Sequence, residues 1–269
     1  MKTILIIALS FIYTLSFSQK LEAIIIVAHV EDDIKEDTIK GSMYQSDLVL
    51  AEKESAFLES KGVIVHKFYG DDAKFKDIVK VSPNCSFFIY RGHGGKTECL
   101  SLMRETPIYY TDPITKKKKE FYYDNIDTIR MKDLKLKKNS IVILNHVCFS
   151  AGSSASDRSE ITNDEAKRRT EMYINSFFNC GASSYFSNNY SSSIYKLLVS
   201  LYEGGNISSF LNTNINKNKH KEEFNTDYKK SKAIKYILYS NQSPKNKYKE
   251  FDICVCSNSD FSLNTIKGK

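Results

Sequence analysis

Three features are missing from this sequence, and each absence argues against one class of protein. The cysteines and histidines do not have the paired spacings of a zinc site, so no metal centre is predicted. The net charge of +7 is not carried on a recognisable module that interleaves basic and aromatic residues, so no nucleic-acid partner is predicted. No apolar run is long enough to cross a bilayer comfortably, so no stable membrane anchor is expected.

The N-terminus has the features of a secretory signal peptide. Lys2 gives a positive start, residues 4–17 are mostly apolar, and the serines at positions 16 and 18 resemble a small-x-small cleavage site. No cysteine lies near that site, so a bacterial lipoprotein anchor is not indicated. We therefore expect residues 1–18 to be removed, the mature chain to begin near Gln19, and the protein to be secreted or periplasmic.

The rest of the chain predicts an α/β domain at residues 19–210 and a Lys- and Asn-rich C-terminal extension at 211–269. Apolar runs of strand length alternate with segments of helical periodicity. This alternation indicates a mostly parallel sheet sandwiched by helices, in a Rossmann-like three-layer arrangement. The strands are expected at residues 21–30, 63–65, 85–90, 141–147 and 182–186. The helices are expected near residues 43–62, 71–81, 127–134, 162–181 and 194–202.

Two regions depart from this alternation. Aromatic-rich runs at residues 108–111 and 121–123 flank a turn that contains proline and lysines, which predicts a projecting β-hairpin inserted into the domain. In the extension, residues 233–239 and 251–255 are apolar enough to contact the domain, and we expect a helix and an edge strand. Residues 150–164 are rich in Ser, Ala and charge, so they predict an exposed, mobile loop.

Two segments carry the candidate chemistry: CSFFIYRGHGG at residues 85–95 and SIVILNHVCFSAGSS at residues 140–154. Each begins as an apolar run and breaks into small and polar residues, as a buried parallel strand does where it leaves the sheet. The carboxyl ends of parallel strands are where open α/β sheets bind ligands. If the two strands are neighbours, His93 and Cys148 lie at the same edge of the sheet.

An imidazole and a thiol in this order suit nucleophilic catalysis, and His93 precedes Cys148 by 55 residues. The pattern resembles the caspase-like cysteine peptidases, the group that holds caspases, metacaspases, legumain and gingipains. The residues that carry the resemblance are Tyr90, Gly92, His93 and Gly94 in the first segment and residues 141–144, Cys148, Ser150 and Gly152 in the second.

The resemblance implies a caspase-like fold and a cysteine endopeptidase that cleaves a peptide or protein substrate through a thioester acyl-enzyme. Cys148 would be the nucleophile and His93 the general acid, and the N–H groups of Gly94 and Cys148 would form the oxyanion hole. No organic cofactor or metal is implied. Some relatives depend on calcium or on proteolytic processing for activation.

The residue that would receive the P1 side chain, on the N-terminal side of the scissile bond, stays open. His146 stands where metacaspases carry an aspartate that helps receive a basic P1 side chain. Asp157 and Asp164 could supply the negative charge instead, whereas Arg91 could receive an acidic P1 side chain. His146 is also the second candidate for the catalytic base, since on a continuing strand it would share a face with Cys148.

Two other functions fit parts of the same segments. Ser150 lies in a Ser-x-Gly sequence, and His93 with the two following glycines resembles the oxyanion loop of esterases, so an α/β-hydrolase that uses Ser150 is conceivable. That fold needs an acid and then a histidine downstream, and only His220 follows. The third hypothesis is a catalytically inactive caspase-like binding module.

Overall fold

The computed structural model describes residues 20–28, 39–95, 99–104, 108–111, 118–121, 126–190, 193–214, 220–225, 234–242, 248–258 and 261–267. The expected signal peptide lies outside the described residues. Within the described ranges, no helix combines the length and the apolar composition that crossing a membrane requires.

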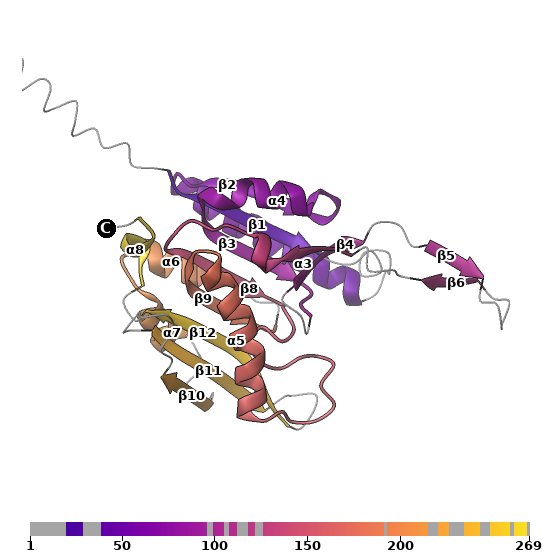
Figure 1. The fold of residues 1–269 in the computed structure, drawn as a ribbon. Coiled ribbons are helices and arrows are strands. Elements are labelled where there is room, and N and C mark those ends of the chain that lie inside the picture. The colour runs from indigo at the N-terminus through magenta and orange to yellow at the C-terminus, as the bar shows by residue number, and fades with distance from the viewer. Residues whose placement is uncertain are drawn as a thin grey trace, which may run out of the picture.

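The central sheet consists, among the described residues, of eight strands: β1 (Glu22–Ala28), β2 (Ile64–Tyr69), β3 (Cys85–Gly92), β8 (Ser140–Asn145), β9 (Ala182–Asn188), β10 (His220–Asn225), β11 (Ile234–Gln242) and β12 (Lys249–Asn258). Their spatial order is β10-β11-β12-β9-β8-β3-β1-β2 (Figure 1). The five strands from β2 to β9 are parallel, and β12, β11 and β10 continue the sheet in antiparallel pairing. The fold is therefore α/β with a mostly parallel sheet, as the sequence predicts.

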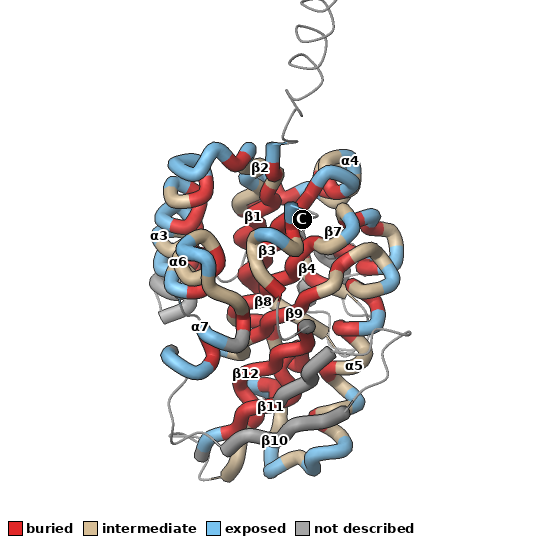
Figure 2. The backbone as a smooth tube through the Cα atoms, turned by 90° about the vertical axis from the view of Figure 1, so that its left-hand side faces the viewer, coloured by how far each residue is buried: buried red, intermediate tan, exposed pale blue. Residues whose placement is uncertain are grey.

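Helices cover both faces of this sheet. One face is covered by α3 (Ile39–Ser60), α6 (Tyr195–Tyr202), α7 (Ile207–Asn214) and α8 (Leu263–Lys267), and the other by α4 (Phe75–Val81) and α5 (Asn163–Asn179). Alternate residues of a strand enter different cores, so Ile25 faces α3 whereas Ile24 faces the α5 side. Figure 2 shows the buried residues along the strands and the exposed ones on the outer faces of the helices. Strands β1, β3 and β8 are nearly continuous buried runs because both of their faces are covered.

Local signals end or start the helices that flank the candidate site. Gly62 has φ of +76°, and the Val63 amide donates to the Leu58 carbonyl at 3.1 Å, which closes the end of α3 as a Schellman motif does. Thr162 caps α5, since its Oγ1 accepts from the Glu165 amide at 3.2 Å. Both boundaries confirm the predicted ones to within two residues.

The helix expected at residues 127–134 is wrong. Residues Ile126–Arg130 form β7, which pairs antiparallel with β4 (Cys99–Arg104), and a single 3₁₀ turn at Met131–Asp133 follows. Three of the five residues in β7 are β-branched, and this favours a strand once a partner strand is present. Residues Ile108–Thr111 (β5) and Lys118–Phe121 (β6) pair as a separate antiparallel ribbon (Figure 1). The second arm of that ribbon therefore begins earlier than residue 121.

The C-terminal extension joins the main sheet. The helix expected at residues 233–239 is wrong, because those residues fall largely in β11, where Leu238 and Tyr239 face opposite cores. The edge strand expected at residues 251–255 is an internal strand, because β12 pairs with β9 on one side and β11 on the other. The edge of β9 that does not pair with β8 offers backbone N–H and C=O groups to β12, and no local sequence pattern predicts this pairing.

Candidate active site

The predicted dyad residues follow two neighbouring strands. Strands β3 and β8 are parallel, and their last paired residues are Arg91 and Asn145. His93 comes two residues after Arg91, and Cys148 comes three residues after Asn145. Both residues therefore leave the sheet at the same carboxyl edge, and both are half-buried.

The segment after His93 touches the segment that carries Cys148. A Cβ atom added to Gly94 would lie 2.6 Å from the Cys148 carbonyl oxygen and 2.5 Å from Cγ1 of Val147. Gly92 has φ of +148°, and its Cβ would lie 2.0 Å from the Ala28 carbonyl oxygen. Only glycine permits backbones to approach this closely.

Tyr173, which projects from α5, links the two segments. Its hydroxyl donates to the Gly95 carbonyl at 2.9 Å and lies 3.5 Å from the Cys148 carbonyl oxygen. Burial raises the pKa of Tyr173, and the nearby Cys148 raises this pKa further. The phenol therefore keeps its proton and remains a donor between the two segments.

The backbone of His93 is fixed from β3 and β4. The Tyr90 hydroxyl lies 2.9 Å from the His93 carbonyl oxygen and 2.5 Å from that of Ser101. The Ser101 amide also donates to the His93 carbonyl at 3.1 Å. The loop that carries His93 is therefore held by β4 on one side and by the Cys148 segment on the other.

Strand β8 ends at Asn145 because His146 has φ of +64°, which no continuing strand allows. Phe149 also has a left-handed φ, of +67°. Each such residue costs about 1–3 kcal/mol and persists only where its surroundings fix it. The expectation that the strand runs to residue 147 is wrong, and with it the reason for placing His146 and Cys148 on one strand face.

The first part of the loop that the sequence predicts to be exposed, residues 150–154, is instead buried and held by hydrogen bonds. Residues 149–154 are buried, and only from residue 155 does the chain become exposed. Ser153 donates its amide to the Phe251 carbonyl at 3.1 Å, and the Phe251 amide donates to Ser153 Oγ at 2.8 Å. Ser150 is fully buried, donates to the Val147 carbonyl at 2.6 Å and contacts the hydroxyl of Ser187. Such a position gives no support to Ser150 as a nucleophile.

A group of four charged or titratable residues, here named the α3-side network, lies behind the strand ends and consists of Arg91, Asp47, Glu54 and His146. Arg91 donates to Glu54 at 2.6 Å and to Asp47 at 3.4 Å, and all three side chains are buried. His146 Nδ1 lies 3.2 Å from the other oxygen of Asp47. The Ile194 amide donates to Glu54, whose pKa is raised by burial although Arg91 opposes that rise.

This arrangement removes Arg91 from the substrate-binding candidates, because its guanidinium is enclosed and neutralised by two carboxylates. His146 keeps 19% of its side chain exposed and is therefore the member of the network that reaches toward the sheet edge. The structure brings His146 close to Asp47, a residue that the sequence analysis did not select.

A second group of charges, the α5-side network, holds the far end of the Cys148 segment. Arg169 forms bonds of 2.8 Å and 3.0 Å to the two oxygens of Asp157 and donates to the Gly152 carbonyl at 3.1 Å. Glu165 accepts from Arg169 at 2.7 Å and from two nitrogens of Arg168. Asp157 is thus occupied by Arg169, which does not support its role toward a basic P1 side chain.

Asp164 stands apart from both networks. It lies exposed in the first turn of α5, where a carboxylate favours the positive end of the helix dipole. Of the four substrate-binding candidates, Asp164 is the most exposed, His146 and Asp157 are partly exposed, and Arg91 is fully buried.

Sequence reasoning missed three residues that organise the site: Asp47, Glu54 and Tyr173. A signal for the first two exists in the sequence. Asp47 and Glu54 lie seven residues apart, on the same helical face as the buried residues Ala51 and Leu58. Carboxylates on an apolar stripe must be paired when buried, so they point to a cation elsewhere in the chain.

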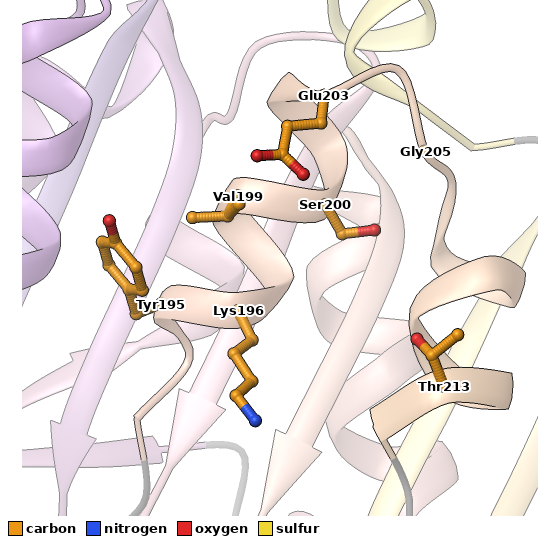
Figure 3. Close-up of a pocket in the computed structure, with 7 residues that line it drawn as sticks. All are labelled: Tyr195, Lys196, Val199, Ser200, Glu203, Gly205 and Thr213. Atoms are coloured by element: carbon orange, nitrogen blue, oxygen red, sulfur yellow. The ribbon is translucent and has the colours of Figure 1, made fainter.

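Two cavities lie on opposite faces of the sheet, and they differ in their relation to Cys148. A groove of about 400 Å³ lies between α6 and α7, where Ser200 and Thr213 face its interior and Tyr195 points away (Figure 3). That groove is on the α3 face of the sheet, whereas Cys148 packs against the core on the α5 face. A smaller pocket of about 90 Å³ borders Phe149, directly after Cys148. Of these two cavities, only the smaller one borders the segment that carries Cys148.

The described residues contain no group of three or more His, Cys, Asp or Glu side chains that could hold a metal ion. All six cysteines are free thiols. No family model, no curated protein and no solved structure matches this chain. Function is therefore inferred from the residues and their geometry.

Proposed function

We propose that this chain is a cysteine endopeptidase of the caspase-like type, with Cys148 as the nucleophile and His93 as the general acid. The observation that carries the proposal is the meeting of the two loops at one sheet edge. Gly94 lies against the Cys148 backbone, and one tyrosine hydroxyl reaches the carbonyls of both loops. Loops fixed in this way hold a histidine and a cysteine at one sheet edge, and this supports acyl transfer by a Cys–His pair.

The reaction follows from these groups. The Cys148 thiolate adds to the scissile carbonyl, and the resulting oxyanion accepts hydrogen bonds from the amides of Gly94 and Cys148. Within the described residues, neither amide donates to a backbone carbonyl, so both donors are available to the proposed oxyanion. His93 protonates the departing amine, and the thioester is then hydrolysed by a water from which His93 takes a proton.

His93 is preferred to His146 as the acid because of where the His146 ring lies. The His146 ring is paired with Asp47 of the α3-side network, on the opposite side of β8 from α5. The β5–β6 ribbon would then be an insertion into the caspase-like fold. The signal peptide, and with it a secreted or periplasmic location, remains a prediction, and the P1 preference stays open.

The test is cleavage of a P1-varied peptide library by the purified chain beside Cys148→Ala and His93→Ala. Both variants are expected to lose about 10³-fold or more in kcat/KM. Cys99→Ala removes another half-buried thiol, and His66→Ala removes a histidine paired with Glu22, so these two variants should retain activity.

A thiol alkylator should abolish the activity and a serine-directed phosphonate should not. Full activity of Cys148→Ala would sink the proposal. Sensitivity to the phosphonate alone would favour the esterase, and binding of a partner by an inactive wild-type chain would favour the binding module.

A further inference from the structure

The pocket of about 90 Å³ beside the nucleophile has walls from two elements that meet at Cys148. Its lining residues are Phe149, Glu165, Arg168, Arg169 and Met172. The four residues from α5 follow the i, i+3, i+4 and i+7 spacing of one helix face. Tyr173, the next residue along α5, is the one that touches the Cys148 and Gly95 carbonyls. The pocket therefore lies between α5 and the segment that directly follows Cys148.

The wall made by Phe149 is fixed before any ligand arrives. Phe149 adopts a left-handed φ of +67°, which is a strained conformation for a bulky residue. Its amide donates to the Ser153 carbonyl at 2.9 Å, and the Arg169 guanidinium lies 5.0 Å from the centre of its ring. A strained aromatic residue held in place next to a reactive thiol is the kind of outlier from which a binding role can be inferred.

The chemistry of the walls selects a neutral guest. Phe149 and Met172 supply apolar surface, and the thioether of Met172 adapts to guests of different shape. Two guanidiniums at the rim pair with two carboxylates: Arg168 and Arg169 bond Glu165, and Arg169 also bonds Asp157, while Arg168 bonding holds the pKa of Glu165 down at about 2. The carboxylates are therefore already paired, and a lysine or arginine guest would find no unpaired carboxylate at this rim.

The size of the pocket restricts the guest further. A volume of about 90 Å³ exceeds the roughly 10–15 Å³ that one water needs and is well below the roughly 300–1,000 Å³ of a small-molecule site, so it suits a single small side chain. We propose that this pocket, here named the Phe149 pocket, receives an apolar side chain of Val, Ile, Leu or Met size from the peptide substrate, next to the scissile bond. This subsite rests on the proposed peptidase function.

The test profiles cleavage sites with an unbiased peptide library varied from P4 to P4′, using the full chain. The wild type should prefer Val, Ile, Leu or Met over Lys and Arg at one position by about tenfold or more. Met172→Trp fills the pocket, so the preference at that position should move to Gly and Ala, while Met172→Leu should keep the wild-type preference.

A second variant keeps the test valid if Met172→Trp fails to fold. Arg168 is 67% exposed and bonds Glu165 on the surface, so Arg168→Gln should fold and should accept Lys at the same position more readily. A wild type with no apolar preference at any position, or a Met172→Trp profile identical to wild type, overturns the subsite and leaves the peptidase intact. Absence of any cleavage above Cys148→Ala overturns the peptidase function and the subsite with it.

Discussion

Two charged networks flank Cys148 on opposite faces of the sheet, and they differ in their access to water. In the α3-side network, the side chains of Arg91, Asp47 and Glu54 are completely buried. In the α5-side network, Glu165 is 33% exposed and Arg168 is 67% exposed. Removing one partner from a buried network strands an unpaired charge, whereas a solvated ion pair contributes little. The segment that carries Cys148 is therefore bordered by a network in which substitution should be strongly destabilising and by one in which it should not.

The largest effect is expected where the buried network loses its cation. Arg91→Leu leaves Asp47 and Glu54 without their partner, and should lower the free energy of unfolding by about 3–5 kcal/mol in urea titrations. Arg130→Leu is the matched control, because Arg130 is exposed, pairs with Asp133 three residues later and lies over the Phe75 ring, and it should cost less than about 1 kcal/mol. A similar small loss for Arg91→Leu would remove the distinction between the networks.

An intermediate effect is expected at the uncharged link between the two loops. Tyr173→Phe deletes the hydroxyl that reaches Gly95 and Cys148, and should cost about 1–3 kcal/mol of stability. Because the loops lose their common donor, kcat should fall more than KM rises. Tyr202→Phe is the control, since the Tyr202 hydroxyl is buried without a hydrogen-bond partner among the described residues. Equal behaviour of the two variants would show that Tyr173 only fills space.

A smaller effect is expected in the α5-side network. Arg169→Gln removes the paired bonds to Asp157 and should cost about 1–2 kcal/mol, because these charge-assisted bonds are only partly shielded from water. Arg168→Gln, at the solvated end, should cost less than about 1 kcal/mol. Chemical denaturation of the two variants in parallel gives both values, and the reverse order would contradict the assignment.

The smallest effect is expected in the pH dependence of the stability, where Glu165 and Glu54 should contribute slopes of opposite sign. The pKa of Glu165 is lowered from 4.5 to about 2, so its contribution to stability is present above pH 4.5 and is lost as the pH falls toward 2. The pKa of Glu54 is raised above 4.5, mainly by burial, so stability is lost as the pH rises through that raised value. Glu165→Gln should flatten the acid side of the stability profile and Glu54→Gln the opposite side. Urea midpoints across pH that move in the same direction for both variants would contradict this prediction.

The parallel half of the sheet could be predicted because its signals are local. Strands β1, β3 and β8 are continuous apolar runs, and glycines or a Thr cap mark the neighbouring helix boundaries. The apolar runs before His93 and Cys148 predict that both residues follow strand ends, and pairing of β3 with β8 brings those ends together. A run of buried residues specifies its own strand because both of its faces must be covered.

The remainder depends on contacts between distant residues, which sequence patterns do not reveal. Ser153 is buried because of Phe251, and its polar sequence surroundings suggest exposure. Arg91 is buried because two carboxylates of α3 lie over it. Strand β11 depends on β12 for its hydrogen bonds. In each case a long-range partner overrides the local tendency.

The two hydrogen bonds between Ser153 and Phe251 have a consequence for folding during synthesis. The two residues are 98 positions apart, and a chain is made from its N-terminus, so β1, β3 and β8 emerge well before Phe251 does. During that interval β8, which precedes Cys148, is already synthesised, whereas Ser153 on the other side of Cys148 still lacks its partner Phe251. A polypeptide truncated before Phe251 therefore lacks the backbone partner that fixes Ser153, five residues after Cys148.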